Sequence, residues 1–150
     1  MQLNITTDYA IRTILYLGEK DGKATTDEIS ENMGIPRGYL EKVLRKLKSA
    51  SYIYSEPGSR GGYYLDKSLN EITLGDVIRT MENTVKINRC LENDCFCSRN
   101  AASVCAIRKF YMRTQKRLEE RIFNVSLKDI LEKETSKEFE VLSDEDMEEK

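Results

Sequence analysis

Residues 25–49 read TTDEISENMGIPRGYLEKVLRKLKS, and this stretch predicts two short helices joined by a tight turn. Thr25 and Glu28 have the spacing of a capping box, so the first helix is expected to begin here and to run to about Met33. Residues 34–36, Gly-Ile-Pro, suit a turn, with the proline at the first position of the next helix. Two short helices around a glycine turn form the helix-turn-helix pattern.

A β-hairpin is expected directly after the second of these helices, which runs from 37 to about 49. Aromatic-rich runs at 52–56 and 63–65 flank the segment PGSRGG at 57–62, whose proline and glycines favour a turn. A helix-turn-helix followed by a hairpin is a winged helix. The sequence therefore predicts a mainly α fold with one small β-hairpin.

Four more helices complete the expected fold, one before the helix-turn-helix and three after the hairpin. A first helix is predicted over 6–17 with Gly18 as its stop, and a capping box at 73–76 opens another through Met81. A long helix is predicted from Ala102 to about Phe123, and Ser126 caps a final short helix. The long helix has an apolar seam whose residues lie alternately three and four positions apart, as in a coiled coil. These residues are Val104, Ile107, Tyr111, Thr114 and Leu118.

These elements divide the chain into four predicted parts. Residues 1–82 form the winged helix-turn-helix domain, and residues 83–101 form a cysteine-rich, cluster-binding loop. Residues 102–134 hold a dimerisation helix and the short helix after it. Residues 135–150 form an acidic tail with few large apolar side chains, a composition that predicts disorder.

The charge distribution is compatible with a nucleic-acid partner although the net charge is −2. From residue 132 onward nine acidic residues face three basic ones, whereas the chain before it holds 21 basic and 17 acidic residues, a net charge of +4. No apolar run approaches the roughly 20 residues that span a bilayer. The N-terminus lacks the pattern of a signal peptide. A cytoplasmic protein without a membrane partner is therefore expected.

The helix over 37–49 and the hairpin tip together favour DNA binding. Lysine and arginine on such a helix neutralise phosphates, and side chains in its N-terminal half can reach base edges. The alternative is that the charged side chains of this helix only form a solvated surface and bind no DNA. Arg60 on a glycine-rich tip suits the minor groove, which shifts the balance toward DNA. The predicted DNA-binding residues are Thr25, Thr26, Arg37, Tyr39, Glu41, Lys42, Arg45, Lys46, Ser59, Arg60, Gly61 and Gly62.

All four cysteines of the chain lie between Cys90 and Cys105, and the chain has no histidine. In a cytoplasmic protein, clustered thiols indicate a metal or redox site rather than a structural disulfide framework. Thiolates select zinc, Cu(I) or iron–sulfur clusters. A four-cysteine zinc site, a reversible disulfide and incidental packed thiols are the alternatives. Without histidine the usual acid–base residue is missing, so no enzyme is expected.

The chain carries a set of segments in order at 7–10, 34–36, 39–41, 60–63 and 72–78, then the cysteine loop and 126–130. With this set it resembles the winged-helix regulators that include IscR and NsrR, over residues 1 to about 134. The resemblance implies a homodimeric repressor of a palindromic double-stranded DNA operator, whose affinity is set by an iron–sulfur cluster that senses nitric oxide, oxygen or cluster supply. Some members instead act without a cluster, through cysteine oxidation or a partner enzyme.

The same resemblance implies a ligand set for the cluster, with [4Fe–4S] expected over [2Fe–2S] and zinc as a minor alternative. Three ligands map to Cys90, Cys97 and Cys105, and Cys95 is the alternative middle ligand. IscR-like members use a histidine where this chain has Arg108. NsrR-like members use an aspartate from the partner's first helix, which matches Asp8 and places the chain nearer that branch. Taken alone, Asp8 and Arg12 would be an ordinary surface pair.

Overall fold

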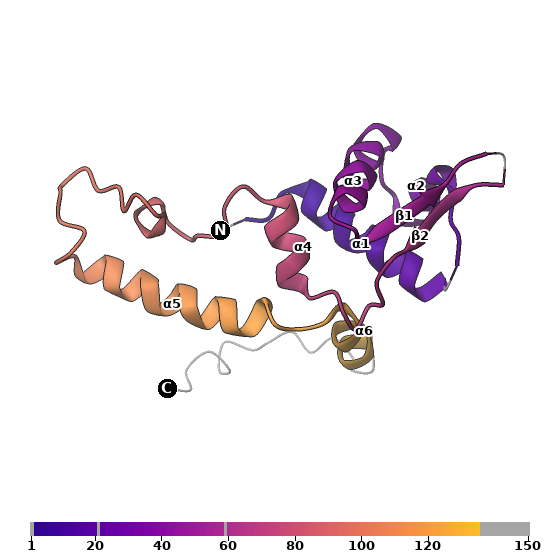
Figure 1. Ribbon diagram of the computed structural model, residues 1–150. Helices are drawn as coiled ribbons and strands as arrows, with labels where there is room; N and C mark the ends of the chain where they lie inside the picture. The colour runs from indigo at the N-terminus through magenta and orange to yellow at the C-terminus, as the bar shows by residue number, and fades with distance from the viewer. Residues whose placement is uncertain (1, 21, 59, 136–150) are drawn as a thin grey trace.

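The computed structural model describes residues 2–20, 22–58 and 60–135. The elements are α1 (Ile5–Lys20), α2 (Thr26–Met33), α3 (Arg37–Ser49), β1 (Ile53–Glu56), β2 (Gly62–Leu65), α4 (Leu74–Met81), the short 3₁₀ helix η1 (Arg89–Leu91), α5 (Ala106–Ile122) and α6 (Leu127–Thr135). Helices α1 to α4, the hairpin and α6 gather at one end, and α5 extends away from them beneath the loop that holds η1 (Figure 1). The predicted mainly α fold with one hairpin is confirmed.

The helix-turn-helix forms where the sequence predicts it. The Thr25 hydroxyl accepts the Glu28 backbone N–H at 3.2 Å, and the Glu28 carboxylate accepts the Thr25 N–H at 2.9 Å, so the capping box is complete. Gly34 ends α2 in the left-handed region, with a φ of 62°. Pro36 stands just before α3 as its N-cap, one residue earlier than predicted.

The hairpin is antiparallel and is fastened to the chain before α2. Its register pairs Ile53 with Leu65 and Glu56 with Gly62. Ala24 and Tyr63 exchange two backbone hydrogen bonds of 3.0 and 2.8 Å, which adds a bridge beside β2. A Cβ at Gly61 would lie 2.1 Å from the Glu56 carbonyl oxygen, so the glycine there permits a tight chain approach rather than supplying a flexible tip.

The core lies where α1 crosses the helix-turn-helix and α4. Its fully buried side chains include Ile14, Leu40, Leu44 and Val77. The prediction that Gly18 stops the first helix is wrong, because α1 continues to Lys20. A Cβ at Gly18 would lie 2.5 Å from the side chain of Leu69. The glycine therefore makes room for a packed leucine and does not end the helix.

The long helix begins later than predicted, at Ala106 instead of Ala102. Residues 102–104 form a turn, and the sulfur of Cys105 accepts the backbone N–H of Arg108 at 3.5 Å as the N-cap. At the other end, Leu127 donates its N–H to the Ile72 carbonyl at 2.9 Å, which ties the start of α6 to the chain before α4. Both flanks of α5 are thus fixed by specific contacts.

Within the described ranges, no helix combines the length and apolar character needed to cross a membrane. The tail predicted over 135–150 lies, apart from Thr135, outside the described residues.

Candidate nucleic-acid interface and candidate metal centre

The N-terminal half of α3 carries charges that neutralise one another. The Arg37 guanidinium lies 2.5 Å from the Asp27 carboxylate of α2 and 3.6 Å from the Glu41 carboxylate one turn along α3. All three side chains are exposed, so they can exchange these partners for others at little cost. The sequence analysis did not predict a role for Asp27, although an acidic residue in the first turn of a helix is a pattern that can be recognised in the sequence.

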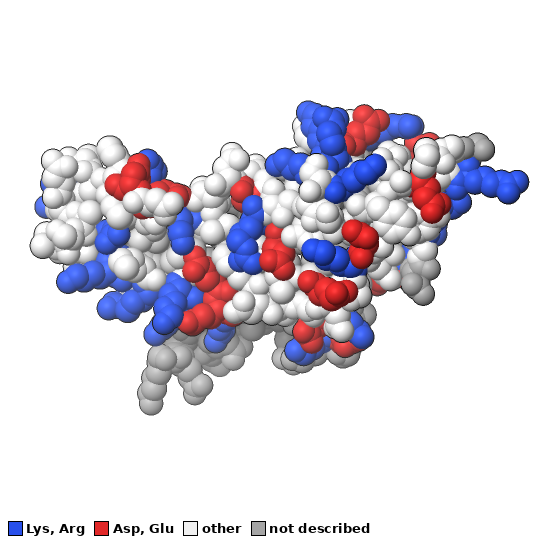
Figure 2. Space-filling model, viewed as in Figure 1, with Lys and Arg blue, Asp and Glu red and all other residues white. Residues whose placement is uncertain are grey.

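The C-terminal half of α3 carries free positive charge. Lys42, Arg45 and Lys46 are exposed, and in the described part of the chain none of them forms an ion pair with a carboxylate. The Lys42 ammonium lies 5.9 Å from the ring centre of Tyr39, whose side chain is half-exposed. Figure 2 shows Lys and Arg gathered over α3 at the top of the view and at the hairpin end on the right.

The wing presents Arg60 on an exposed turn, between Gly58 and Gly61. The Lys23 ammonium donates to the Arg60 carbonyl at 2.7 Å and so holds this turn against the chain before α2. Nothing in the sequence pointed to Lys23. Ser59 lies outside the described residues. The remaining residues predicted to contact DNA lie at the N-terminus of α2 (Thr25 and Thr26) and at the start of β2 (Gly61 and Gly62).

Asp8 is linked to α3 by a short series of contacts. Its carboxylate lies 2.5 Å from the Arg12 guanidinium, which is 5.9 Å from the ring centre of Tyr9. Arg12 also donates to the Met33 carbonyl at the end of α2, at 3.3 Å. Tyr9 in turn meets Tyr39 of α3 edge to face, with ring centres 6.0 Å apart. The first helix, the turn and α3 are therefore in contact around Arg12.

Cys97 has a thiol whose charged form is favoured by its surroundings. The backbone N–H groups of Ala101 and Arg99, and then the Arg99 charge, hold the pKa of the Cys97 thiol below its ordinary value of 9.0. Such N–H···S contacts stabilise a thiolate and are found around iron–sulfur ligands. Asn100, at a φ of 50°, closes a turn after Cys97, in which its N–H donates to the Cys97 carbonyl at 3.0 Å.

The other three cysteines lie around Arg108. Its side chain donates to the Cys90 carbonyl at 3.0 Å and to the Cys95 sulfur at 3.3 Å, and its backbone N–H reaches the Cys105 sulfur. Cys90 belongs to η1, Cys105 caps α5, and Cys95 is exposed with a φ of 49°. No disulfide joins these four described cysteines.

Gln115 fastens the segment before Cys90 to α5, a role that the sequence did not reveal. This nearly buried amide donates to the Val85 carbonyl at 2.9 Å and accepts the Ile87 N–H at 2.8 Å. It also donates to Glu119 at 2.9 Å, which forms an ion pair of the same length with Lys86. One face of α5 therefore holds the start of the cysteine loop, at 85–87.

The donor set fits an iron–sulfur cluster in its chemistry, since it offers several thiols in one loop and N–H donors to their sulfurs. The donors do not converge in the single chain, however. Among the described residues, no three or more Cys, Asp or Glu side chains lie close enough together to hold a metal ion. Between Leu91 and Ala106 the loop has no helix or strand, so few backbone hydrogen bonds oppose its rearrangement.

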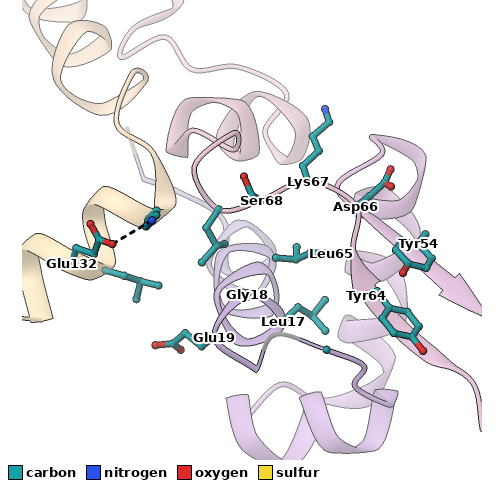
Figure 3. A pocket seen from close by; sticks show the side chains of 14 residues that line it. Leu17, Gly18, Glu19, Tyr54, Tyr64, Leu65, Asp66, Lys67, Ser68 and Glu132 are labelled. Atoms are coloured by element: carbon teal, nitrogen blue, oxygen red, sulfur yellow. Dashed lines mark ion pairs between the residues drawn. The ribbon is translucent and has the colours of Figure 1, made fainter.

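A hollow of about 570 Å³ lies between the end of α1, the hairpin and α6, away from these sites (Figure 3). The rings of Tyr54 and Tyr64 stack at its edge with their centres 4.9 Å apart. Its rim mixes acids and bases, including Glu19, Asp66 and Lys67. No predicted site residue lines it.

Comparison with known proteins places the chain in a family. The family profile Rrf2, described as an iron-dependent transcriptional regulator, matches residues 3–133. Solved structures with the same fold include a Listeria innocua protein assigned as a transcriptional regulator, at 24% identity and a TM-score of 0.77, over 95% of this chain and 93% of that one. CymR, the global cysteine regulator of B. subtilis, has 23% identity and a TM-score of 0.72, over 89% and 98%. IscR of T. potens has 22% identity and a TM-score of 0.69, over 92% and 93%.

At identities this low, the solved structures show a shared winged-helix fold. The profile match extends over most of the 150 residues, from α1 through α6. The chain belongs to the Rrf2 family of DNA-binding transcriptional regulators, and it is not an enzyme.

Proposed function

We propose that this chain is a cytoplasmic repressor whose affinity for a palindromic operator is set by an iron–sulfur cluster at the cysteine loop. The observation that carries the proposal is the gathering of four unpaired thiols in one loop beside α5, with donors from Arg108 at two of the sulfurs. Donors of this kind favour the thiolate that binds metal, whereas a packed structural thiol gains little from them.

The DNA interface is α3 together with the wing. Arg37, Tyr39 and Glu41 reach base edges, while Lys42, Arg45 and Lys46 contact phosphates. Arg60 enters the neighbouring minor groove, and the ends of α2 and β2 at Thr25, Thr26, Gly61 and Gly62 approach the backbone. This division follows the pattern of paired charges at one end of α3 and unpaired ones at the other.

The ligands are Cys90, Cys97 and Cys105 of one protomer and Asp8 of the other. When bound, the cluster would supply an iron–sulfur centre that reacts with nitric oxide or oxygen, with [4Fe–4S] favoured over [2Fe–2S]. Asp8 is a weaker ligand than a thiolate, and Arg12 competes for it. Because Arg12 also contacts Tyr9 and the Met33 carbonyl, a change of partner at Asp8 would alter contacts beside α3.

A homodimer is part of the same proposal. Val104 in the turn before α5 is 76% exposed, and Ile107 and Phe110 in the first turns of α5 are 59% and 55% exposed. Apolar side chains this close together on one side of a helix mark an interaction surface. A second copy that crosses along α5 would cover them and would supply the partner's first helix.

The test is elemental and spectroscopic analysis of protein purified without oxygen. We expect a brown protein with a broad visible band and with iron and sulfide in matching amounts. Cys97→Ser should lose both, whereas Cys95→Ser, the matched control two residues away, should keep them. A colourless wild-type protein that contains zinc alone, or no metal, would contradict the cluster. Retention of iron by Cys97→Ser and its loss from Cys95→Ser would reverse the assignment of the middle ligand.

Control by cysteine oxidation is the second candidate function, and Cys95 favours it. Its sulfur is exposed and accepts a hydrogen bond from the charged Arg108 guanidinium, the surroundings that make a thiol reactive. A metal-free protein whose DNA affinity changes on treatment with peroxide, and recovers with a thiol reductant, would support this function over the cluster.

A further inference from the structure

Helix α5 carries a row of exposed basic side chains, which we name the basic stripe. Its members are Lys109, Arg113, Arg117 and Arg121, spaced four residues apart. Side chains at this spacing lie one turn apart on the same side of a helix, so the charges form one continuous row. Figure 2 shows Lys and Arg along α5 at the lower left of the view, apart from those gathered over α3.

The basic stripe has no anionic partner in the part of the chain that the structure describes. The side chains of its members form neither an ion pair nor a hydrogen bond with any described residue. Beside them, Lys116 pairs with Glu120 at 3.8 Å. Like charges four residues apart repel one another and destabilise a helix. The stripe therefore lowers the stability of α5 unless an anion covers it.

A second copy of α5 does not supply that anion. Within its bounds α5 has two carboxylates, those of Glu119 and Glu120. Glu119 forms an ion pair with Lys86 at 2.9 Å, and Glu120 is the partner of Lys116. A second α5 laid along the first would bring a second row of cations and no free carboxylate. The partner of the basic stripe has to come from another part of the molecule.

The chain itself contains an anionic segment, residues 136–150, which lies outside the described residues. Seven acidic residues and two basic ones give this segment a net charge of −5. Blocks of acidic residues of this kind are typical of interaction tails. The segment therefore has the charge that the basic stripe lacks.

The segment starts within reach of the basic stripe. Helix α6 follows α5 after residues 123–126, and it lies near the C-terminal end of α5 (Figure 1). The 15 residues at 136–150 span at most about 50 Å when extended. Helix α5, with 17 residues, is about 25 Å long. A segment that leaves α6 at Thr135 can therefore run along the whole stripe of the same chain.

We propose that residues 136–150 dock along the basic stripe of α5 in the same chain, where their carboxylates pair with the four cations. The contact is electrostatic, so it weakens as the salt concentration rises. None of the stripe residues belongs to the proposed DNA interface or to the proposed cluster ligands. The docked segment screens the stripe from other polyanions, so that α3 and the wing remain the surface open to DNA.

The first experiment follows the backbone amides of residues 138–149 by NMR in the full chain. Arg113→Gln combined with Arg117→Gln should shift these resonances at low salt, and the difference from the wild type should vanish at about 0.5 M salt. The matched control is Lys42→Gln with Arg45→Gln, the same charge change on α3, which should leave these resonances in place. Equal shifts with the control pair, or no shift with the stripe pair, would overturn the docking.

The second experiment captures the contact by carbodiimide coupling, which joins a lysine amine to a nearby carboxylate as an amide while the carbodiimide takes up water as a urea. Mass spectrometry of the digest should find Lys109 joined to carboxylates at 138–149. In a mixture of ¹⁵N-labelled and unlabelled protein after complete subunit exchange, each joined pair should carry a single isotope. Mixed isotopes would assign the segment to a second copy, and coupling to Lys42 in place of Lys109 would assign it to α3. Either result would overturn the proposal.

The third experiment measures binding to a duplex of random sequence. With all seven acidic residues of the segment changed to Asn or Gln, binding should tighten by about tenfold at low salt, because the stripe is uncovered. Adding Arg113→Gln with Arg117→Gln should remove this gain, whereas the same pair in the wild-type chain should have little effect. Adding Lys67→Gln with Lys128→Gln, the matched charge change away from α5, should leave most of the gain.

Additive effects of the segment and the stripe in this cycle would mean that the two do not meet. The proposed function and the docking fail separately. A wild-type protein that binds no duplex would contradict the proposed DNA binding, and the NMR and coupling results would still decide the docking.

Discussion

The carboxylate of Glu82 caps α1 although it is 78 residues from Asn4 in sequence. It accepts the Asn4 backbone N–H at 2.7 Å, the Asn4 side-chain amide at 2.8 Å and the Thr7 hydroxyl at 2.5 Å. Partial burial raises the pKa of Glu82, but these hydrogen bonds outweigh burial and hold the pKa below its usual value of 4.5. The charged form of Glu82 is therefore favoured by folding.

The pH dependence of stability tests this cap. A depressed pKa contributes stability that is fully present above the unfolded value and is lost as the pH falls through the folded value. Glu82→Gln should therefore cost about 1 kcal/mol near neutral pH, and the difference from the wild type should shrink in acid, below the usual value of 4.5. Urea unfolding of both proteins across this range measures the difference. A difference that does not change with pH would mean that the charge of Glu82 is not involved.

Sequence reasoning finds single residues where the signal is local. The capping boxes at Thr25 and Thr73 were predicted to the residue, because both partners lie three positions apart. Glu82 and Gln115 were missed, because their partners lie 28 to 78 residues away and no short pattern marks them. Asp8 was singled out through the family resemblance, and its contact with Arg12 adds a physical neighbour to that prediction.

At the scale of elements, the errors in helix bounds arise from tertiary packing and an unusual cap. Glycine is a common helix stop, but Gly18 lies inside α1 because Leu69 occupies the space of a Cβ. The start of α5 was misplaced because apolar spacing extends back to Val104, whereas the sulfur of Cys105 caps the helix. The convergence of metal ligands could not be judged from sequence at all, since it depends on how the loop folds.

Helix α5 holds the segment at 85–87 mainly through Gln115, and this contact can be tested alone. Gln115→Leu should expose the Ile87 amide to faster hydrogen exchange, because the buried N–H loses its acceptor at a cost of about 1–3 kcal/mol. Exchange in α1 to α3 should stay as in the wild type. Lys116→Gln, at the exposed neighbouring position, is the control. Unchanged exchange at Ile87 would show that other contacts fix the segment.

At the scale of the whole molecule, α5 has two unlike faces. Arg108, Gln115 and Glu119 lie on the face that binds the cysteine loop, and Ile107 and Phe110 lie away from it, exposed. Isolated exposed apolar residues are ordinary, but Ile107 belongs to the seam that the sequence predicted from its spacing, and Phe110, which that prediction did not include, lies beside it. The second face has no partner within the described residues, so a second copy of the chain is the partner that the proposed function requires.

Ile107→Lys should separate the proposed dimer into monomers, because a lysine ammonium in a covered apolar seam would be buried without a counter-charge. Sedimentation equilibrium should then give the 17.3 kDa of one chain. Met112→Lys is the control, since Met112 is 48% exposed on the side of α5 that faces the loop. If the dimer supplies Asp8 across the interface, Ile107→Lys should also lose iron under anaerobic conditions while its winged helix stays folded. A wild-type protein that sediments as a monomer would contradict both the dimer and the assignment of a second protomer's Asp8 as a cluster ligand.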